Sequence, residues 1–376
     1  MTMRPLADIR VLDFSTLLPG PMATLMLAEA GAEVIKVERP PVGDGMRTYE
    51  PEVAGDSLFF ALLNRGKKSI AVDLKDPRSV ERIRALIAGV DILVEQFRPG
   101  VMDRLGLGYE SMRAINPKIV YCSITGYGQT GPKAQKAGHD LNYVAESGLL
   151  SLVTDSDGSP KLPHTLIADI GGGAYPAFMN ILLALLNVQK SNTGCHIDIA
   201  MNDFTFPFAY MTVGQGLAAN MWPEPNGLHS TGASPRYNIY RTSDGRYLAA
   251  APLEEHFWKN FCEVIGLEPA LRDDTKDSDA TLAAVRASIA RNRSAYWLAK
   301  FADVDACVSA VATTEEAVLE PHLASRGVFS HQLAIGGRIV PAAPVPIANI
   351  FRGEPRSDDY PALGESNGLL EPPPAA

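Results

Sequence analysis

Cysteine is scarce in this sequence, and its scarcity excludes several classes of protein. The 376 residues include four cysteines, which lie far apart and lack the close spacing of metal ligands. The seven histidines do not supply such a site, because none stands at ligand spacing from a second histidine or a cysteine. We therefore expect free thiols in a reducing compartment and no metal. The cysteines are Cys122, Cys195, Cys262 and Cys307.

The sequence also lacks a surplus of positive charge and a long unbroken apolar run, and we expect no amino-terminal leader. The net charge of −9 argues against broad binding to nucleic acid, which needs a basic face. Mixed polar sequence follows Arg4 where a signal peptide would have an apolar run, so we expect a cytoplasmic protein. The stretch from Leu166 to Val188 is apolar but is interrupted by Asp169, Pro176 and Asn180. We expect a buried helix there, too short in its continuous apolar part to span a membrane.

Several common catalytic signatures are absent as well. The first predicted strand is followed by LLPGPMA, which has neither a G-x-G-x-x-G fingerprint nor a phosphate-loop lysine. No G-x-S-x-G elbow occurs, and no Cys–His or Ser–His–Asp hydrolase signature is present. The sequence therefore does not imply NAD or ATP.

Strand-like and helix-like segments do alternate through the first part of the chain. Such alternation predicts an α/β fold, with a mostly parallel sheet covered by helices on both faces. The predicted strands are 9–15, 33–39, 69–74, 91–97, 118–126 and 196–201, with clear helices at 21–32 and 79–89.

The composition changes further along the chain. Residues 211–236 are rich in Gly, Pro and Asn, as a linker would be. In 237–325 two alternating runs flank Asp244-Gly245, a strong hairpin signal, and helical patterns follow. Short strands and Pro-rich turns return over 326–376. We predict a large domain from 1–210, completed by the return segment, and a smaller α+β domain between.

Two short motifs place proton carriers beside glycine at predicted helix starts. AGHDLNY contains His139, and ADIGGGAYPAF contains Asp169. Free N–H groups and the positive end of the helix dipole favour negative charge developing on a ligand. An imidazole and a carboxylate aimed at one carbon could remove a proton from one face and return it to the other. The alternative is two ordinary helix caps, for which Asp and Gly are common.

Basic residues follow predicted strands in the first third of the chain. Each could be an ordinary solvated charge. Several together in an acidic protein suit a ligand with more than one phosphate, for which arginine is well shaped. Lys133 and Lys136, just before the His139 motif, could join that pocket. The cations after the strands are Lys36, Arg39, Lys67, Lys68 and Arg98.

In their order along the chain, many motifs resemble the family III CoA-transferase superfamily (CaiB/BaiF), and within it the α-methylacyl-CoA racemases. The resemblance implies a Rossmann-like large domain with a smaller α+β domain, an interlocked homodimer, and a role in lipid and fatty-acid metabolism. It implies an acyl-CoA substrate, with coenzyme A as part of that substrate and no further cofactor. The motifs are RVLDFS, LAEAGAEVIKVERP, NRGKKSIAVDLK, EQFRPGVMDRLGLGYE, ITGYGQTGP, AGHDLNY, ADIGGG, YRTSDGRYLAAA and PALGES.

Within the superfamily, three features favour a racemase. Racemases have His and Asp at the positions of His139 and Asp169, whereas members that transfer CoA between carboxylic acids usually have Tyr at the first. Those members also tend to have Gln where this chain has Leu18, and a glycine-run loop where it reads APLEEHFW. The resemblance thus implies epimerisation of a 2-methylacyl-CoA by 1,1-proton transfer at the α-carbon, through an enolate.

The resemblance also implies roles for residues around the two bases. Glu254, from the partner subunit, would position His139; its plainer interpretation is a helix-end charge. The backbone N–H of Asp140 would stabilise the enolate oxygen. Gly138 and the five cations would contact coenzyme A.

Two other functions stay open. One is an acyl-CoA:carboxylate CoA-transferase in which Asp169 is the nucleophile of a covalent intermediate. The other is a non-catalytic acyl-CoA-binding protein. An acyl groove could involve Met201, Phe204, Phe206 and Met211, which could equally be core residues.

Overall fold

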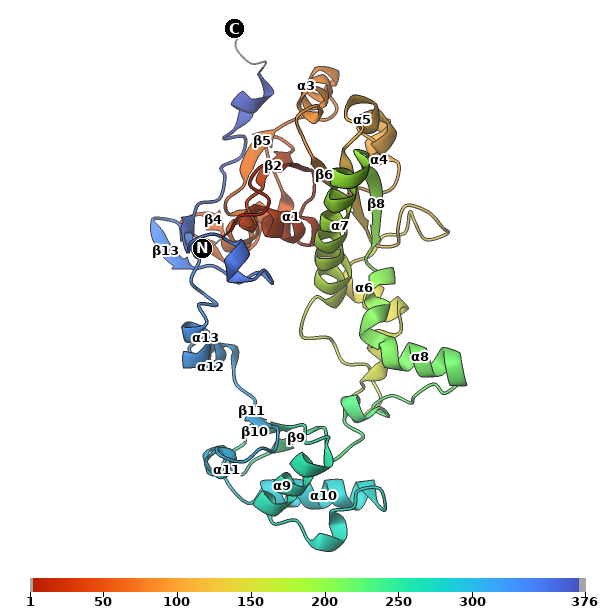
Figure 1. Ribbon diagram of the computed structural model, residues 1–376, viewed down its shortest axis with the longest axis vertical. Helices are drawn as coiled ribbons and strands as arrows, with labels where there is room; N and C mark the ends of the chain where they lie inside the picture. The colour runs from red at the N-terminus through yellow and green to blue at the C-terminus, as the bar shows by residue number, and fades with distance from the viewer. Residues whose placement is uncertain (1–2, 372–376) are drawn as a thin grey trace. The chain divides into compact units, whose positions relative to one another are not determined.

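The computed structural model describes residues 3–371, which fall into two compact units. The first unit consists of the chain up to Ser147, the segment Pro163–Phe208 and the chain from His322 onward. The second consists of Gly148–Leu162 and Ala209–Pro321. The colours of Figure 1 follow the chain out of the first unit, through the second and back.

A six-stranded sheet runs through the first unit, and every neighbouring pair of its strands is parallel. Counted along the chain, the spatial order is 3-2-1-4-5-6, that of a doubly wound fold. The predicted α/β fold is therefore confirmed. In spatial order the strands are β5 (Lys68–Ala71), β2 (Glu33–Glu38), β1 (Arg10–Asp13), β6 (Ile92–Glu95), β7 (Val120–Thr125) and β8 (Cys195–Ala200).

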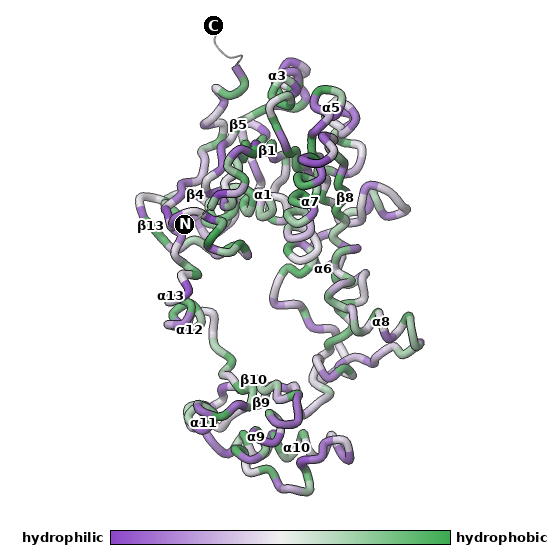
Figure 2. Tube along the Cα trace, viewed as in Figure 1, coloured by the Kyte–Doolittle hydropathy of each residue, from purple (hydrophilic) through white to green (hydrophobic). Residues whose placement is uncertain are grey.

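Helices follow most of these strands. Figure 2 colours α1 mainly hydrophobic, as expected of a helix whose residues are nearly all buried. The helices of this part are α1 (Pro19–Glu29), α2 (Leu58–Asn64), α3 (Pro77–Ile87), α4 (Val101–Arg104), α5 (Tyr109–Ile115), α6 (Asp140–Glu146) and α7 (Tyr175–Ser191).

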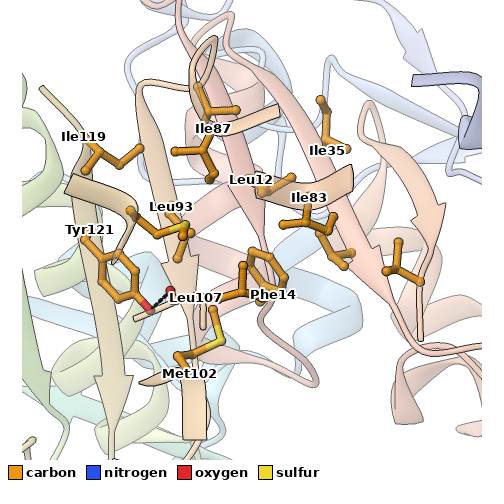
Figure 3. Packing of buried hydrophobic residues seen from close by; sticks show 14 of the residues in the cluster. Leu12, Phe14, Ile35, Ile83, Ile87, Leu93, Met102, Leu107, Ile119 and Tyr121 are labelled. Carbon is orange, nitrogen blue, oxygen red and sulfur yellow. Dashed lines mark hydrogen bonds between the residues drawn. The ribbon is translucent and has the colours of Figure 1, made fainter. Parts of the chain in front are cut away.

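Alternate side chains of the strands pack on opposite faces of the sheet, because successive residues of a strand point to opposite sides. Leu12 of β1 packs in one cluster with Ile83 and Ile87 of α3, as Figure 3 shows. Asp13, the next residue, faces α1, where its carboxylate accepts the hydroxyl of Thr24 at 2.6 Å. Helices therefore cover both faces of the sheet.

The direction of the connections reverses between β1 and β6, which are neighbours in the sheet but not in the chain. From β1 the chain continues to β2 on one side, and from β6 it continues to β7 on the other. In open α/β sheets, such a switch point leaves a crevice beyond the carboxyl ends of the strands, where ligands bind.

The apolar segment before β8 forms one helical stretch, Ile167–Ser191, in which the π-helix η3 (Ile167–Ala174) continues into α7. Among residues 3–371 it is the one helix long and apolar enough to cross a membrane by length and composition, so the prediction that it is too short is wrong. Its sequence also suits a core helix, and α7 packs on α1, β7 and β8. The predicted burial holds only in part, because Met179, Leu183 and Leu186 are exposed.

The returning chain adds a small sheet to the first unit, in the order β13-β12-β14. A buried ion cluster attaches this segment to α1. The Glu29 carboxylate forms ion pairs with Arg65 at 2.7 Å and with Arg352 of the return segment at 2.9 Å. The strands are β12 (Gln332–Ile335), β13 (Arg338–Pro341) and β14 (Ser357–Asp358), and a further hairpin pairs β3 (Glu52–Val53) with β4 (Asp56–Ser57).

The second unit has its own core around Trp258, Phe261 and Trp297. Its β9 and β10 are antiparallel on either side of Asp244-Gly245, so the predicted hairpin is confirmed. The predicted linker contains the helix α8, which its composition did not indicate. The elements are α8 (Tyr210–Ala219), β9 (Asn238–Arg241), β10 (Tyr247–Ala250), α9 (Glu255–Ile265), α10 (Ser278–Ile289), α11 (Ser294–Phe301), β11 (Val308–Ala310) and α12 (Thr314–Val318), with α13 (Pro321–Ser325) at the boundary.

Candidate active site

A cavity of about 460 Å³ lies at the switch point of the sheet. His139 and Asp169 both line it, so the structure brings the two predicted proton carriers together. We call it the His139 cavity. Its wall also includes Leu17 and Pro19 after β1, Gln96, Phe97, Arg98 and Pro99 after β6, Ile124, Thr125 and Gly126 at the end of β7, and Met201 after β8.

Asp169 belongs to η3, a π-helical turn of the kind often found at functional sites. The three glycines that follow it allow close packing. A Cβ on Gly172 would lie 2.4 Å from the backbone oxygen of Met201, and one on Gly171 would lie 2.4 Å from the ring of Phe208. The Gly-Gly-Gly run thus lets η3 approach the chain after β8.

Asp140 holds this turn in place through its side chain. Its Oδ1 accepts the backbone N–H of Ala168 at 2.7 Å and that of Asp169 at 3.0 Å. The Asp140 side chain is buried at 6% exposure, so both hydrogen bonds are shielded from water. From the sequence only the backbone N–H of Asp140 was expected to act; the contact made by its side chain, between residues 29 apart in sequence, was not predicted.

The same arrangement changes the acidity of the candidate base. The pKa of Asp169 is raised to about 6, chiefly by burial and also by the nearby Asp140 carboxylate, while His139 opposes the rise. A carboxylate that titrates near the working pH is suited to both accept and return a proton. Burial also raises the pKa of Tyr143, another residue of the cavity wall, to about 12, so its hydroxyl stays protonated.

His139 immediately precedes α6. It is an exposed residue and lines the cavity. Its backbone N–H donates to Oδ1 of Asn142 at 3.0 Å, which fixes the start of the helix. Gly138 packs under the ring of Tyr143, where a Cβ would approach a ring carbon to 2.7 Å, and its carbonyl accepts the Tyr143 hydroxyl at 2.5 Å. The close approach to Tyr143 accounts for glycine at this position.

The backbone N–H of Asp140 is at the amino-terminal end of α6 and donates no hydrogen bond within residues 3–371. Groups at this end of a helix are available to an outside acceptor. The placement is compatible with the predicted stabilisation of an oxygen on the ligand.

Arg98 and Arg39 stand at the carboxyl edge of the sheet. Arg98 lines the His139 cavity, and Arg39 lines a neighbouring hollow of about 400 Å³, which we call the Arg39 hollow. Phe97 is part of both walls, and Lys75 also lines the Arg39 hollow. Neither arginine forms an ion pair with a residue in the described part of the chain, so both guanidinium groups are free to meet an anion.

The other three predicted cations are placed differently. Lys36 and Lys67 have fully buried side chains; Lys36 pairs with Asp44 at 2.8 Å and Lys67 with Asp13 at 3.4 Å. Burial lowers the pKa of Lys67 to about 7, an effect that Asp13 opposes. These ion pairs take up both charges inside the protein. Lys67 lines neither the His139 cavity nor the Arg39 hollow, so its expected phosphate contact is corrected to a structural role; Lys36 does line the Arg39 hollow, but its charge is paired there with Asp44.

Lys68 is the first residue of β5 and therefore lies toward the amino edge of the parallel sheet, away from the His139 cavity. It pairs there with Glu33, the first residue of β2. The expected contact of Lys68 with the same ligand is corrected for this reason. Lys133 and Lys136 both pair with Glu146, and Lys136 also lines the cavity.

Glu254 belongs to the second unit, where it immediately precedes α9 and is exposed. Of the residues considered for an acyl groove, Met201 lines the His139 cavity, Phe204 and Phe206 belong to the first unit, and Met211 belongs to the second. Within residues 3–371, no group of three or more His, Cys, Asp and Glu side chains is placed to hold a metal ion.

Comparisons with known proteins agree with this architecture. A family model described as CoA-transferase family III matches residues 6–367. The acetyl-CoA:oxalate CoA-transferase of Acetobacter aceti is 33% identical over 354 residues, which cover 92% of this chain and 89% of that protein. The alpha-methylacyl-CoA racemase of Homo sapiens is 34% identical over 333 residues, covering 86% and 82%. A crystal structure of a CAIB/BAIF family protein from Brucella suis has a TM-score of 0.82 at 27% identity and covers 99% of this chain and 100% of that one. The chain belongs to CoA-transferase family III.

Proposed function

We propose that this protein epimerises 2-methylacyl-CoA thioesters by moving a proton at the α-carbon. The observation that carries the proposal is that His139 and Asp169 line the same cavity, with the pKa of Asp169 raised to about 6. A racemase needs one base on each face of the carbon, one protonated and one not. A carboxyl group with a pKa of about 6 can hold or release a proton close to neutral pH, as one of these two bases must.

The two bases act with a donor for the developing charge. A positioned base contributes about 10²–10⁴-fold, which is not enough for so weak a carbon acid as a thioester. Stabilisation of the enolate oxygen supplies the rest, and the free N–H of Asp140 is the donor that we propose. Asp140 thus serves twice, with its N–H toward the substrate and its carboxylate toward Asp169.

We assign the coenzyme A part of the substrate to the carboxyl edge of the sheet. Arg98 at the His139 cavity and Arg39 in the adjoining hollow, neither of them in an ion pair within residues 3–371, offer guanidinium groups to phosphate oxygens. The acyl end would then lie against Leu17, Ile124 and Met201, the apolar side chains of the cavity wall. We further propose a cytoplasmic homodimer in which Glu254 of the partner subunit orients His139.

A CoA-transferase is the second candidate, because Asp169 faces the same cavity and relatives of both kinds have similar identity to this chain. In that reaction Asp169 attacks the thioester carbonyl and forms an anhydride with the acyl group. Three features favour the racemase: His139, Leu18 and the segment APLEEHFW, which has no glycine run.

The assay that separates the two uses one epimer of a chiral 2-methylacyl-CoA. A racemase forms the other epimer without any added acid. A transferase forms a new thioester only when a carboxylic acid acceptor is supplied. Acceptor-dependent transfer with no epimer formed would replace the first proposal by the second.

A further inference from the structure

Glu95, the last residue of β6, is a buried carboxyl group directly next to the candidate site. Its side chain is 4% exposed and lines a hollow of about 200 Å³, which we call the Glu95 hollow. Arg98 lines both this hollow and the His139 cavity. The two spaces are therefore separated by the turn that carries Arg98.

That turn, Gln96–Pro99, is held at four points. Oε2 of Glu95 accepts the backbone N–H of Phe97 at 2.8 Å. Oε1 of Gln96 accepts the N–H of Gly20 at 3.1 Å, and the carbonyl of Arg98 accepts the N–H of Val101 at 3.1 Å. The carbonyl of Pro99 accepts Nε2 of Gln135 at 3.0 Å. The backbone of the turn is thus tied, whereas the Arg98 guanidinium has no ion-pair partner within residues 3–371.

These contacts connect the turn with the other side of the cavity. Gly20 belongs to α1, and Gln135 precedes His139 by four residues. Of the four contacts, the one from Glu95 is the one made by a buried ionisable side chain. A change at Glu95 therefore acts on Arg98 and on the segment leading to His139 together.

Building on the proposed function, we propose that Glu95 is a positioning residue of the acyl-CoA site, which holds the Gln96–Pro99 turn in the shape that directs Arg98 to the ligand. It touches neither the substrate nor the reacting carbon in this role. Its action is on the backbone that carries Arg98.

The groups around Glu95 should make its effect on ligand affinity depend on pH. The pKa of Glu95 is raised to about 7, chiefly by burial; Asp103 of α4 and Asp198 of β8 add to the rise, while Ser123 and the N–H of Phe97 oppose it. Tyr121 and Cys122 on β7 are also close, and burial keeps both protonated by raising their pKa values. The remaining charged or titratable groups that line the hollow are Arg98, Tyr109, Glu110 and His196.

Bound coenzyme A should shift the equilibrium between the protonated and ionised forms of Glu95 in one direction. Its phosphates add negative charge, and its bulk removes water, so both effects favour the protonated form of Glu95. The hydrogen bond from Phe97 to Glu95 is already present in the free protein, so it does not oppose the change in protonation that binding causes. Affinity for coenzyme A should therefore fall as pH rises through about 7.

The test measures binding of coenzyme A by calorimetry at about pH 6 and about pH 8. Glu95→Gln keeps an oxygen acceptor for Phe97 but cannot ionise, and Glu95→Ala removes the acceptor. We expect Glu95→Ala to weaken binding roughly three- to tenfold. Glu95→Gln should bind within about twofold of wild type at the lower pH and lose the part of the pH dependence that wild type owes to Glu95. Every ionisable group other than Glu95 is common to both proteins, so its contribution cancels in the comparison.

Glu110→Gln is the matched control, because Glu110 lines the same hollow but its side chain is 78% exposed and does not contact the turn. It should leave both affinities unchanged. The proposal is overturned if Glu95→Gln keeps the full pH dependence, or if folded Glu95→Ala binds coenzyme A as wild type does. Should Glu95→Ala fail to fold, the pH comparison with Glu95→Gln decides alone. Arg98→Ala distinguishes failure of the Arg98 contact from failure of the Glu95 role. If Arg98→Ala binds coenzyme A as wild type does, the proposed contact of Arg98 with the ligand is wrong. If Arg98→Ala binds more weakly but the Glu95 variants bind as wild type does, only the role of Glu95 is wrong.

Discussion

The carboxylate of Asp140 accepts the backbone N–H of Asp169 at 3.0 Å, so one acidic residue holds another at the wall of the same cavity. The contact has two effects. It secures the turn of η3 that carries Asp169, and its negative charge makes Asp169 harder to ionise.

The first prediction concerns this pair. Asp140→Asn keeps an oxygen that can accept the two N–H groups but removes the charge, so the pKa of Asp169 should fall from about 6. The acidic limb of the pH profile of kcat/KM should then move to lower pH, while the fold is retained. Asp140→Ala should lose both hydrogen bonds and cost about tenfold or more in kcat. A pH profile of Asp140→Asn identical to wild type would contradict the coupling.

The second prediction assigns His139. His139→Ala should lower epimerisation by a factor of about 10² or more and leave binding of coenzyme A nearly intact, because a base is lost without a ligand contact. His164→Ala, at an exposed position outside the cavity wall, is the matched control and should retain activity. Near-normal turnover by folded His139→Ala would remove His139 from the mechanism.

The third prediction concerns the phosphates of the substrate. Arg98→Ala and Arg39→Ala should each raise KM more than they lower kcat, and the loss of affinity in wild type with added salt should be smaller in the variants. Arg78→Ala is a suitable comparison, because Arg78 has a side chain that is 91% exposed on α3 and lines neither the cavity nor the Arg39 hollow. If all three variants have the KM of wild type, Arg98 and Arg39 are ordinary surface charges and do not contact the substrate.

The fourth prediction tests the proposed dimer. If Glu254 of the partner subunit orients His139, co-expressed His139→Ala and Glu254→Ala chains should form heterodimers with one complete site. Activity should then exceed that of either variant alone, reaching about a quarter of wild type if chains pair at random and only the complete sites work. Absence of any recovery, with both single variants folded and inactive, would indicate that the two residues act within one chain.

Much of the fold could be predicted from local patterns. The strands predicted at 9–15, 33–39 and 118–126 are short segments rich in Ile, Val and other apolar residues between turn residues, and all three occur in the parallel sheet. The hairpin around Asp244-Gly245 could be predicted as well, because this dipeptide is typical of a hairpin turn. Helix α8 was missed because Gly214, Gly216 and Asn220 in and after it resemble a linker, although the helix ends at Asn220 in a left-handed conformation.

The candidate site was predicted in part. His139 and Asp169 could be found because each stands beside glycine at a helix start. The burial of Lys36 and Lys67 could not, since it depends on Asp44 and Asp13, partners that come together only in the folded sheet. The side-chain role of Asp140 was missed for the same reason, because a contact across 29 residues leaves no mark in local sequence.

Exchange of the α-hydrogen tests the central claim most directly. In deuterated water, with an acyl-CoA and no carboxylic acid acceptor, a proton taken up by His139 or Asp169 can exchange with solvent before it returns. The account predicts deuterium at C2 of the recovered acyl-CoA, and no acyl-aspartyl anhydride trapped by hydroxylamine. Transfer that requires an acceptor, with a trapped anhydride at Asp169 and no deuterium at C2, would contradict the racemase mechanism.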